Sequence, residues 1–212
     1  MRPGALQTSM RRLLIVPLLI AGLALAPQNS ALERFAQSWA AIPAYHATLV
    51  MHETAGSDVQ DRTYDFTFSK PHHATIAIAA GPGRGGREEW DGGSTVVASP
   101  PGIFSHMHIK VALTDPRVVT LRGDTVAMAS FGWVLAHLQT DGTVMQKPGP
   151  TIEGNATNEL TLTITDPAKS GGYTRDIVDC STATGLPVRV QRFIGSDLVK
   201  TIAYSNVAPN AP

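Results

Sequence analysis

Strict alternation of apolar and polar residues is the feature that most constrains this chain. Residues 62–69 place tyrosine and phenylalanine at every second position, and residues 160–165 alternate leucine or isoleucine with threonine. Successive side chains of a strand point to opposite faces, so this period of two gives each strand one apolar and one polar face. Such strands are typical of antiparallel sheets with one face against a core and one in water. The chain is therefore predicted to be mostly β.

Similar strand patterns recur along the chain, and two helices are expected between them. Ser30 and Glu33 form a capping-box pattern at the start of the first helix, which should end before Pro43. Apolar residues at helical spacing from Met128 to Leu138 predict a second helix that ends near Gly142. The order is helix, about five strands, helix and about four strands. The expected strands cover residues 45–53, 62–69, 73–80, 87–90, 94–99, 160–165, 173–180, 187–193 and 198–204, with short ones at 109–113 and 118–121.

The order of elements limits the fold class. No strand–helix–strand rhythm and no internal repeat is present, which argues against a parallel α/β sheet and against a solenoid. The 212 residues suit one domain with a leader, and 19 glycines and 15 prolines supply many turns. A single curved antiparallel sheet with two helices against one face fits these patterns best.

The first 26 residues are interpreted as a cleaved secretory signal peptide. Arg11 and Arg12 precede an apolar run at residues 13–26 that closes on small residues. The run is shorter than the roughly 20 residues of a stable membrane span, although a permanent N-terminal anchor remains the alternative. The expected domains are the signal peptide at 1–26, one domain at 27–207 and a loose tail at 208–212. The protein is thus expected to be exported.

Composition excludes some classes of function. Seventeen basic residues balance 17 acidic ones, so the chain lacks the basic excess of a nucleic-acid-binding protein. Cys180 is the single cysteine, which rules out an intramolecular disulfide. No nucleophile elbow of the G-x-S-x-G type occurs, so an enzyme is not expected.

The order of several short motifs resembles the LolA/LolB superfamily of periplasmic outer-membrane lipoprotein carriers and sorting proteins. A capped helix leads into the strand Tyr45–Val50, an aromatic-rich strand ends in Lys70-Pro71, and the hairpin 91–96 follows. Residues 184–190, the Gly195 turn and residues 198–206 complete the order, so that the resemblance covers residues 31–206.

The resemblance implies a half-open antiparallel barrel whose concave face, partly covered by helices, binds acyl chains. It implies a periplasmic location and no cofactor. The implied partners are lipid or the acyl chains of a lipoprotein, with an inner-membrane loading complex or an outer-membrane acceptor. In the carrier an arginine before the proline helps to close the lid. Lys70 has this lid-gating position here, but it lacks the planar fork of donors of an arginine.

The candidate ligand site is the apolar face of the sheet and of the second helix. Holding about 15 methylene groups in water costs about 12 kcal/mol, which a dry slot would relieve. The same residues could instead form an ordinary closed core, and their periodicity does not separate the two readings. The candidate acyl-chain residues are Leu49, Met51, Tyr64, Phe66, Phe68, Ile76, Ile78, Phe131, Val134, Leu135 and Leu138.

Two other motifs match the patterns of nucleotide-binding and metal-binding sites in part. Residues 81–86 match the dinucleotide pattern G-x-G-x-x-G, but no helix follows them, so a hairpin loop is expected. His106 and His108 would project to the same side of a strand, which is a possible start of a zinc or copper site but not a complete one. The alternatives to a lipid carrier are therefore an envelope sensor or interaction module with a filled core, and a metal-dependent enzyme at these histidines.

Overall fold

The alternating segments form one antiparallel sheet of eleven strands in the computed structural model, which describes residues 30–210. The spatial order is β6-β5-β4-β3-β2-β1-β11-β10-β9-β8-β7. The strands are β1 Ala44–Ala55, β2 Asp58–Ser69, β3 His73–Ala80, β4 Arg87–Asp91, β5 Thr95–Ser99, β6 Ile109–Ala112, β7 Gly142–Pro148, β8 Thr157–Ile164, β9 Arg175–Ser181, β10 Pro187–Ile194 and β11 Asp197–Pro209. The helical elements are α1 Ala31–Ala41, α2 Phe131–Thr140 and the 3₁₀ turns η1 Gly102–Phe104 and η2 Val126–Ala129.

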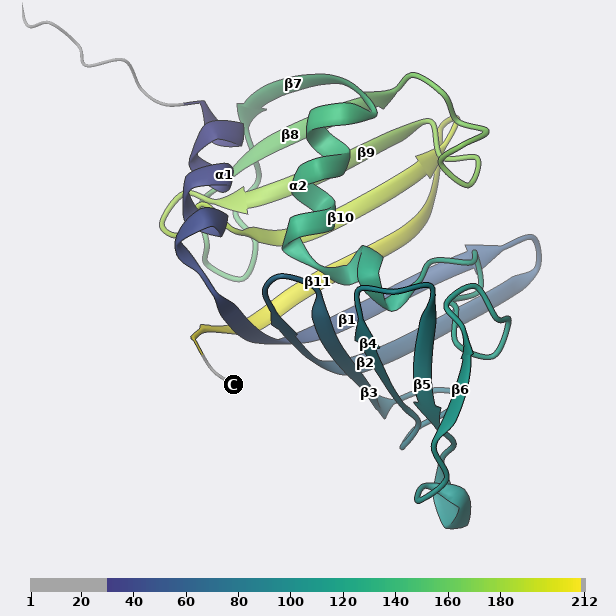
Figure 1. The fold of residues 1–212 in the computed structure, drawn as a ribbon. Coiled ribbons are helices and arrows are strands. Elements are labelled where there is room, and N and C mark those ends of the chain that lie inside the picture. Colours follow the sequence, from purple (N-terminus) through teal and green to yellow (C-terminus); the bar gives the residue numbers. More distant parts are fainter. Residues whose placement is uncertain (1–29, 211–212) are drawn as a thin grey trace, which may run out of the picture.

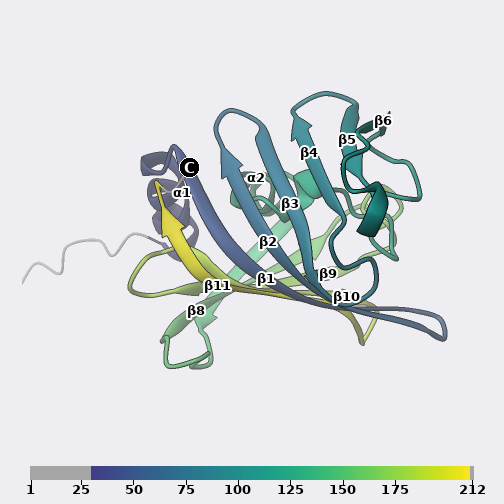
Figure 2. The same ribbon diagram turned by 90° about the horizontal axis from the view of Figure 1, so that it is seen from below.

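The first and last strands lie side by side in the middle of the sheet. β1 pairs with β11, the first six strands run outward to one edge, and the last five return from the other edge. The connection between the two edges passes through η2 and α2, which lie over one face of the bent sheet (Figure 1). Figure 2 shows the same bend from below, with α1 beside one end of the strands. The expected open, curved antiparallel sheet with helices on its concave face is confirmed.

The first helix has the predicted boundaries because its capping groups are in place. The Ser30 hydroxyl accepts a hydrogen bond from the Glu33 N–H, and the Glu33 carboxylate accepts one from the Ser30 N–H. The helix ends at Ala41, just before Pro43, and Phe35 is its fully buried residue.

The second predicted helix is divided in two. Ser130 has an extended backbone and separates η2 from α2, and its hydroxyl accepts a hydrogen bond from the Trp133 N–H as an N-cap. The apolar residues from Met128 to Leu138 therefore belong to a 3₁₀ turn and a separate helix. Their spacing alone does not distinguish this arrangement from one continuous helix.

The observed strands differ from the expected ones in several places. Residues 118–121 form turns instead of a strand, and Thr120 N–H donates to the Asp124 carbonyl. β7 was not expected, because this edge strand is mostly exposed and lacks alternation. Six strands precede α2 and five follow it, and β11 extends to Pro209, so the expected tail at 208–212 begins within a strand.

Strand register places the predicted apolar residues on one face. Leu49 lies opposite Tyr64, which in turn lies opposite Ile78, and Phe66 lies opposite Ile76. No helix within residues 30–210 is long and apolar enough to cross a membrane. The expected signal peptide at 1–26 lies outside the described residues.

Candidate functional site

Aromatic rings fill one end of the concave face. The rings of Tyr45 and Phe131 stack with centroids 4.4 Å apart, and the Tyr45 hydroxyl accepts a hydrogen bond from the Phe131 N–H at 3.1 Å. Phe35, Phe66 and Phe131 are fully buried. We call this cluster the aromatic end; it consists of Phe35, Trp39, Tyr45, Phe66, Phe68 and Phe131.

Two cavities lie farther along the same strands. The first, of about 50 Å³, lies between β1, β2, β3, β10 and β11 and the segment 118–134. The second, of about 300 Å³, lies between β3, β4, β5 and β6 and the loops at 83–86 and 100–101. Arg62, Glu88 and Val118 line both cavities, so these three side chains form the partition between them. We call this region the cavity end.

The candidate acyl-chain residues divide between these two regions. Five of them line the first cavity and Ile78 lines the second. The other five lie in the buried core and line neither cavity, although all five were expected from the sequence to contact a ligand. The five in the first cavity are Leu49, Met51, Tyr64, Ile76 and Val134, and the five in the core are Phe66, Phe68, Phe131, Leu135 and Leu138.

Glu88 and Arg62 are the charged groups of the partition. Arg62 Nε donates to the Pro82 carbonyl at 2.8 Å, which holds the guanidinium beside the cavities. Within residues 30–210, the Glu88 carboxylate has no hydrogen-bond or ion-pair partner at contact distance. Burial raises the pKa of Glu88 to about 7, and the Arg62 charge opposes this rise. The partition can therefore change its charge near neutral pH.

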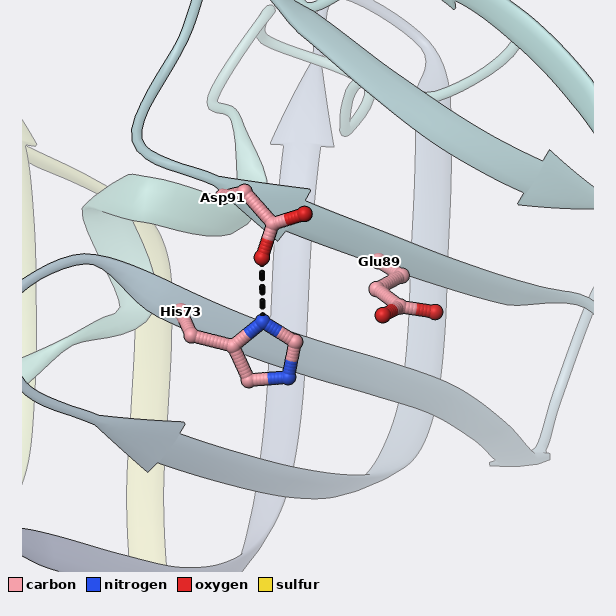
Figure 3. Close-up of side chains that lie close together, drawn as sticks. All are labelled: His73, Glu89 and Asp91. Atoms are coloured by element: carbon pink, nitrogen blue, oxygen red, sulfur yellow. Dashed lines mark hydrogen bonds and ion pairs between the residues drawn. The ribbon is translucent and has the colours of Figure 1, made fainter.

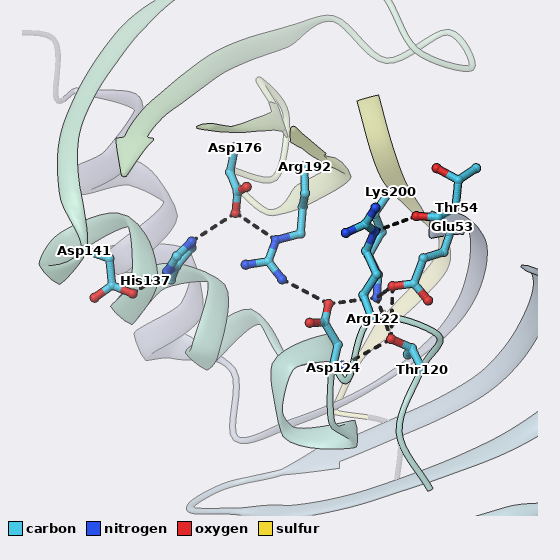
Figure 4. A network of polar contacts seen from close by, with 10 residues as sticks. All are labelled: Glu53, Thr54, Thr120, Arg122, Asp124, His137, Asp141, Asp176, Arg192 and Lys200. Carbon is cyan, nitrogen blue, oxygen red and sulfur yellow. Dashed lines mark hydrogen bonds and ion pairs between the residues drawn. The ribbon is translucent and has the colours of Figure 1, made fainter. Parts of the chain in front are cut away.

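Figure 4 shows a chain of buried charged side chains. Three of them, Asp124, Arg192 and Lys200, line the first cavity. Lys200 Nζ lies 2.9 Å from Glu53 Oε1 and 2.8 Å from Asp124 Oδ2. Arg192 continues the chain, with Nη1 3.0 Å from Asp124 Oδ2 and Nε 3.1 Å from Asp176 Oδ2. Burial opposes ionisation of Asp124, but Lys200 and Arg192 outweigh it and lower the pKa of this carboxyl. The ion pairs thus hold segment 120–124 against β1, β10 and β11.

His137 extends this chain into α2. Its Nε2 lies 3.0 Å from Asp176 Oδ2, and its Nδ1 lies 2.5 Å from Asp141 Oδ2. Each ring nitrogen faces a carboxylate oxygen, and both can donate only when the ring is protonated. The side chain of His137 is 4% exposed, so these contacts attach the covering helix to β9.

Sequence reasoning missed the charged chain, although a signal was present. Glu53 follows Leu49 and Met51 in the alternation, and Lys200 precedes Ile202 and Tyr204 in the same way. A charged residue in phase with a buried apolar face must have a partner, because an unpaired buried charge is costly. The alternation identifies such positions but not which of them pair.

Lys70 contacts the end of α1, at the place where a lid-gating residue was expected. Its Nζ donates to the carbonyls of Trp39 at 2.6 Å and Ala40 at 3.2 Å. The same ammonium lies 4.3 Å from the centroid of a Trp39 ring. Lys70 thus joins the turn after β2 to the last turn of the helix, through one nitrogen atom instead of a guanidinium fork.

The two other sequence motifs lie in loops. Residues 81–86 join β3 to β4 as a turn, as expected. His106 and His108 lie between η1 and β6, and His108 Nδ1 lies 3.0 Å from the Ser99 hydroxyl. Among residues 30–210, neither histidine belongs to a group of three metal-ligating side chains.

Comparisons with known proteins find similarity in structure alone. No family model matches the sequence, and no curated protein matches it. Lipoprotein LppX of Mycobacterium tuberculosis is 13% identical, with a TM-score of 0.47 over 86% of this chain and 94% of LppX. LprF of Mycobacterium bovis is 15% identical, with a TM-score of 0.47 over 87% and 96%. A LolA superfamily protein of Nitrosomonas europaea is 12% identical, with a TM-score of 0.42 over 86% and 93%. The superfamily that the sequence motifs resemble is thus among the similar structures.

Proposed function

We propose that this chain is an exported, non-enzymatic protein that binds an acyl chain of a lipid or lipoprotein at the cavity end. The observation that carries the proposal is the pair of adjoining, largely apolar cavities between the bent sheet and the segment that covers it. Every CH₂ group moved from water into such a space contributes about 0.8 kcal/mol. The signal-peptide pattern at residues 1–26 supports a periplasmic location.

The cavity volumes favour a single chain. The second cavity, at about 300 Å³, is at the lower end of the range of about 300–1,000 Å³ that small-molecule sites have. The first, at about 50 Å³, accepts only the end of a chain unless the partition at Val118 moves. The aromatic end leaves no such volume, so a second acyl chain would have to displace buried rings.

A carrier or sorting role would require a donor and an acceptor for the lipid. We include in the proposal an inner-membrane loading complex or an outer-membrane acceptor as the partner. Lys70 has the position to regulate release, because its contacts with Trp39 and Ala40 keep α1 against the sheet.

Native mass spectrometry of protein purified from its host, followed by lipid extraction, tests the proposal. We expect one co-purifying acyl lipid per chain, and displacement of a fluorescent fatty acid from the purified protein. Ala98→Phe fills the second cavity and should weaken that binding at least about tenfold, whereas Ala112→Phe on the exposed side of β6 should not. Absence of lipid together with absence of fatty-acid binding would contradict the proposal.

The filled aromatic end supports a second candidate function, an envelope sensor or protein-interaction module. In this case the concave face is a structural core, and the outer face or an edge strand binds a protein. A pull-down from delipidated extract that recovers one protein partner, with Ala98→Phe leaving the recovery unchanged, would favour this function over lipid transport.

A further inference from the structure

Three side chains with metal-ligating atoms meet on the outer face of β3 and β4. His73 begins β3 and lies directly opposite Asp91 of β4, and Thr75 lies opposite Glu89. Alternation along β4 places Glu89 and Asp91 on the face opposite to Glu88, which lines the cavities. Figure 3 shows the Asp91 carboxylate above the His73 ring and the Glu89 side chain to its upper right, along β4.

The distances between these groups suit one small cation. One ligand atom from each of the three residues lies within 4.8 Å of the other two, and no other group of three in residues 30–210 does so. His73 Nδ1 is 2.5 Å from Asp91 Oδ1. In a tetrahedral zinc site, ligand atoms at about 2.1 Å from the metal are about 3.4 Å apart. Small side-chain rotations would bring the three groups to that spacing.

The Glu89 carboxylate is available to a ligand. Within the described residues it makes no hydrogen bond and no ion pair. The two neighbouring ligands are accessible from solvent, with 42% of the His73 side chain and 78% of the Asp91 side chain exposed. A hydrated cation therefore has a direct path of entry, and the paired strands hold the three backbone positions fixed.

Two further histidine–aspartate pairs on the outer face provide an internal comparison. His52 Nδ1 lies 2.7 Å from Asp61 Oδ1, and His46 Nε2 contacts Asp65. Neither pair has a third ligand within reach among residues 30–210. These pairs are ordinary cross-strand contacts, whereas the His73 pair has an additional unpaired carboxylate beside it.

We propose that His73, Glu89 and Asp91 bind a divalent first-row transition metal, of which Zn²⁺ is the best match. An imidazole nitrogen with two carboxylates is a normal donor set for zinc, whereas Mg²⁺ and Ca²⁺ prefer oxygen donors alone. Three protein ligands leave the remaining coordination position to water or to a group from a partner. The metal would also join β3 to β4 across the outer face, opposite the second cavity. This site does not depend on lipid binding.

Isothermal titration calorimetry of the purified full chain without a histidine tag, using zinc chloride at neutral pH, tests the site. We expect one Zn²⁺ per chain and no comparable binding of Mg²⁺. Glu89→Gln and His73→Ala should each weaken zinc binding at least about tenfold. His52→Ala is the matched control and should leave zinc binding unchanged.

Cobalt gives an independent readout. Co²⁺ in place of Zn²⁺ should produce the visible absorption of a low-symmetry protein site, and Glu89→Gln should abolish it. Two results would overturn the proposal: absence of zinc binding by the wild-type protein, or equal affinities for wild type and Glu89→Gln. All three substituted residues lie on the outer face, so circular dichroism should confirm that the variants fold.

Discussion

The aromatic end and the cavity end lie on the same strands, yet only the aromatic end is filled. In β2, Phe66 and Phe68 belong to the filled region, and Tyr64, two residues away, lines the first cavity. At the aromatic end large rings from both helices meet the sheet. At the cavity end aliphatic side chains face a chain of charged groups, whose positions are set by ion pairs. Alternation thus defines the concave face, while the size and charge of the opposing side chains decide whether it fills.

Removing a buried ring should give the largest difference between the two regions in the free energy of unfolding. Phe131→Ala removes a fully buried ring that stacks on Tyr45, and we expect a loss of about 3–5 kcal/mol in the free energy of unfolding. Met51→Ala borders an existing cavity and should cost about 2 kcal/mol. Urea denaturation measures both. Equal losses would mean that the two regions are packed alike.

Breaking the chain of buried charges should lower the free energy of unfolding nearly as much. Lys200→Met leaves Glu53 and Asp124 without their shared cation, and we expect a loss of about 3–5 kcal/mol at neutral pH. The pKa of Asp124 is held below its ordinary value, so its contribution is present above about pH 4 and is lost as pH falls. The difference between wild type and Lys200→Met should therefore shrink in acid. A pH-independent difference would contradict this account.

Glu88 in the partition should have a smaller effect on the free energy of unfolding, and this effect should depend on pH. The folded protein holds the Glu88 proton up to about pH 7, whereas the unfolded chain releases it near pH 4.5, so wild-type stability falls between these values. The Glu88→Gln variant has no carboxyl group at this position, so its stability does not fall in this way. We expect it to exceed wild type by about 1–2 kcal/mol above pH 7 and to equal it near pH 4. Thermal unfolding across this pH range measures the difference, and Glu153→Gln in an exposed loop is the control.

Removing the contact between Lys70 and α1 should have the smallest effect. Lys70→Met loses two hydrogen bonds to helix carbonyls, and we expect a loss of about 1 kcal/mol in the free energy of unfolding. Lys70→Arg should retain most of the stability, because a guanidinium can reach both carbonyls. Hydrogen exchange of the α1 amides reports the same change locally. Unchanged exchange in Lys70→Met would show that Lys70 does not hold the helix.

The extent of sequence-based prediction differs among the elements. The first helix was predicted to within one turn because Ser30 and Glu33 satisfy its free amides locally. Strand β3 was predicted with its actual bounds, since its alternation is undisturbed. Residues 118–121 were assigned to a strand because they are largely apolar, but they form turns. Val118 is buried at the partition between the two cavities and not on a strand.

The alternation predicted the candidate site only as an apolar face, and the acyl-chain cavity was implied by the family resemblance. The eleven apolar candidates share the concave side, but their residue types carry no information on the side chains they meet from the other edge of the sheet. The chain of buried charges is the clearest case. Glu53 and Lys200 lie 147 positions apart in the chain and face each other only because β1 pairs with β11.

The amino-acid sequence by itself determined the period of each strand, the cap of the first helix and hence the antiparallel class of fold, since these depend on contacts between near neighbours in the chain. The tertiary structure alone decided where the concave face is filled, which buried charges neutralise each other and which outer side chains meet at His73. These depend on the pairing of residues that are distant in sequence, and on the volume left after all their side chains have packed.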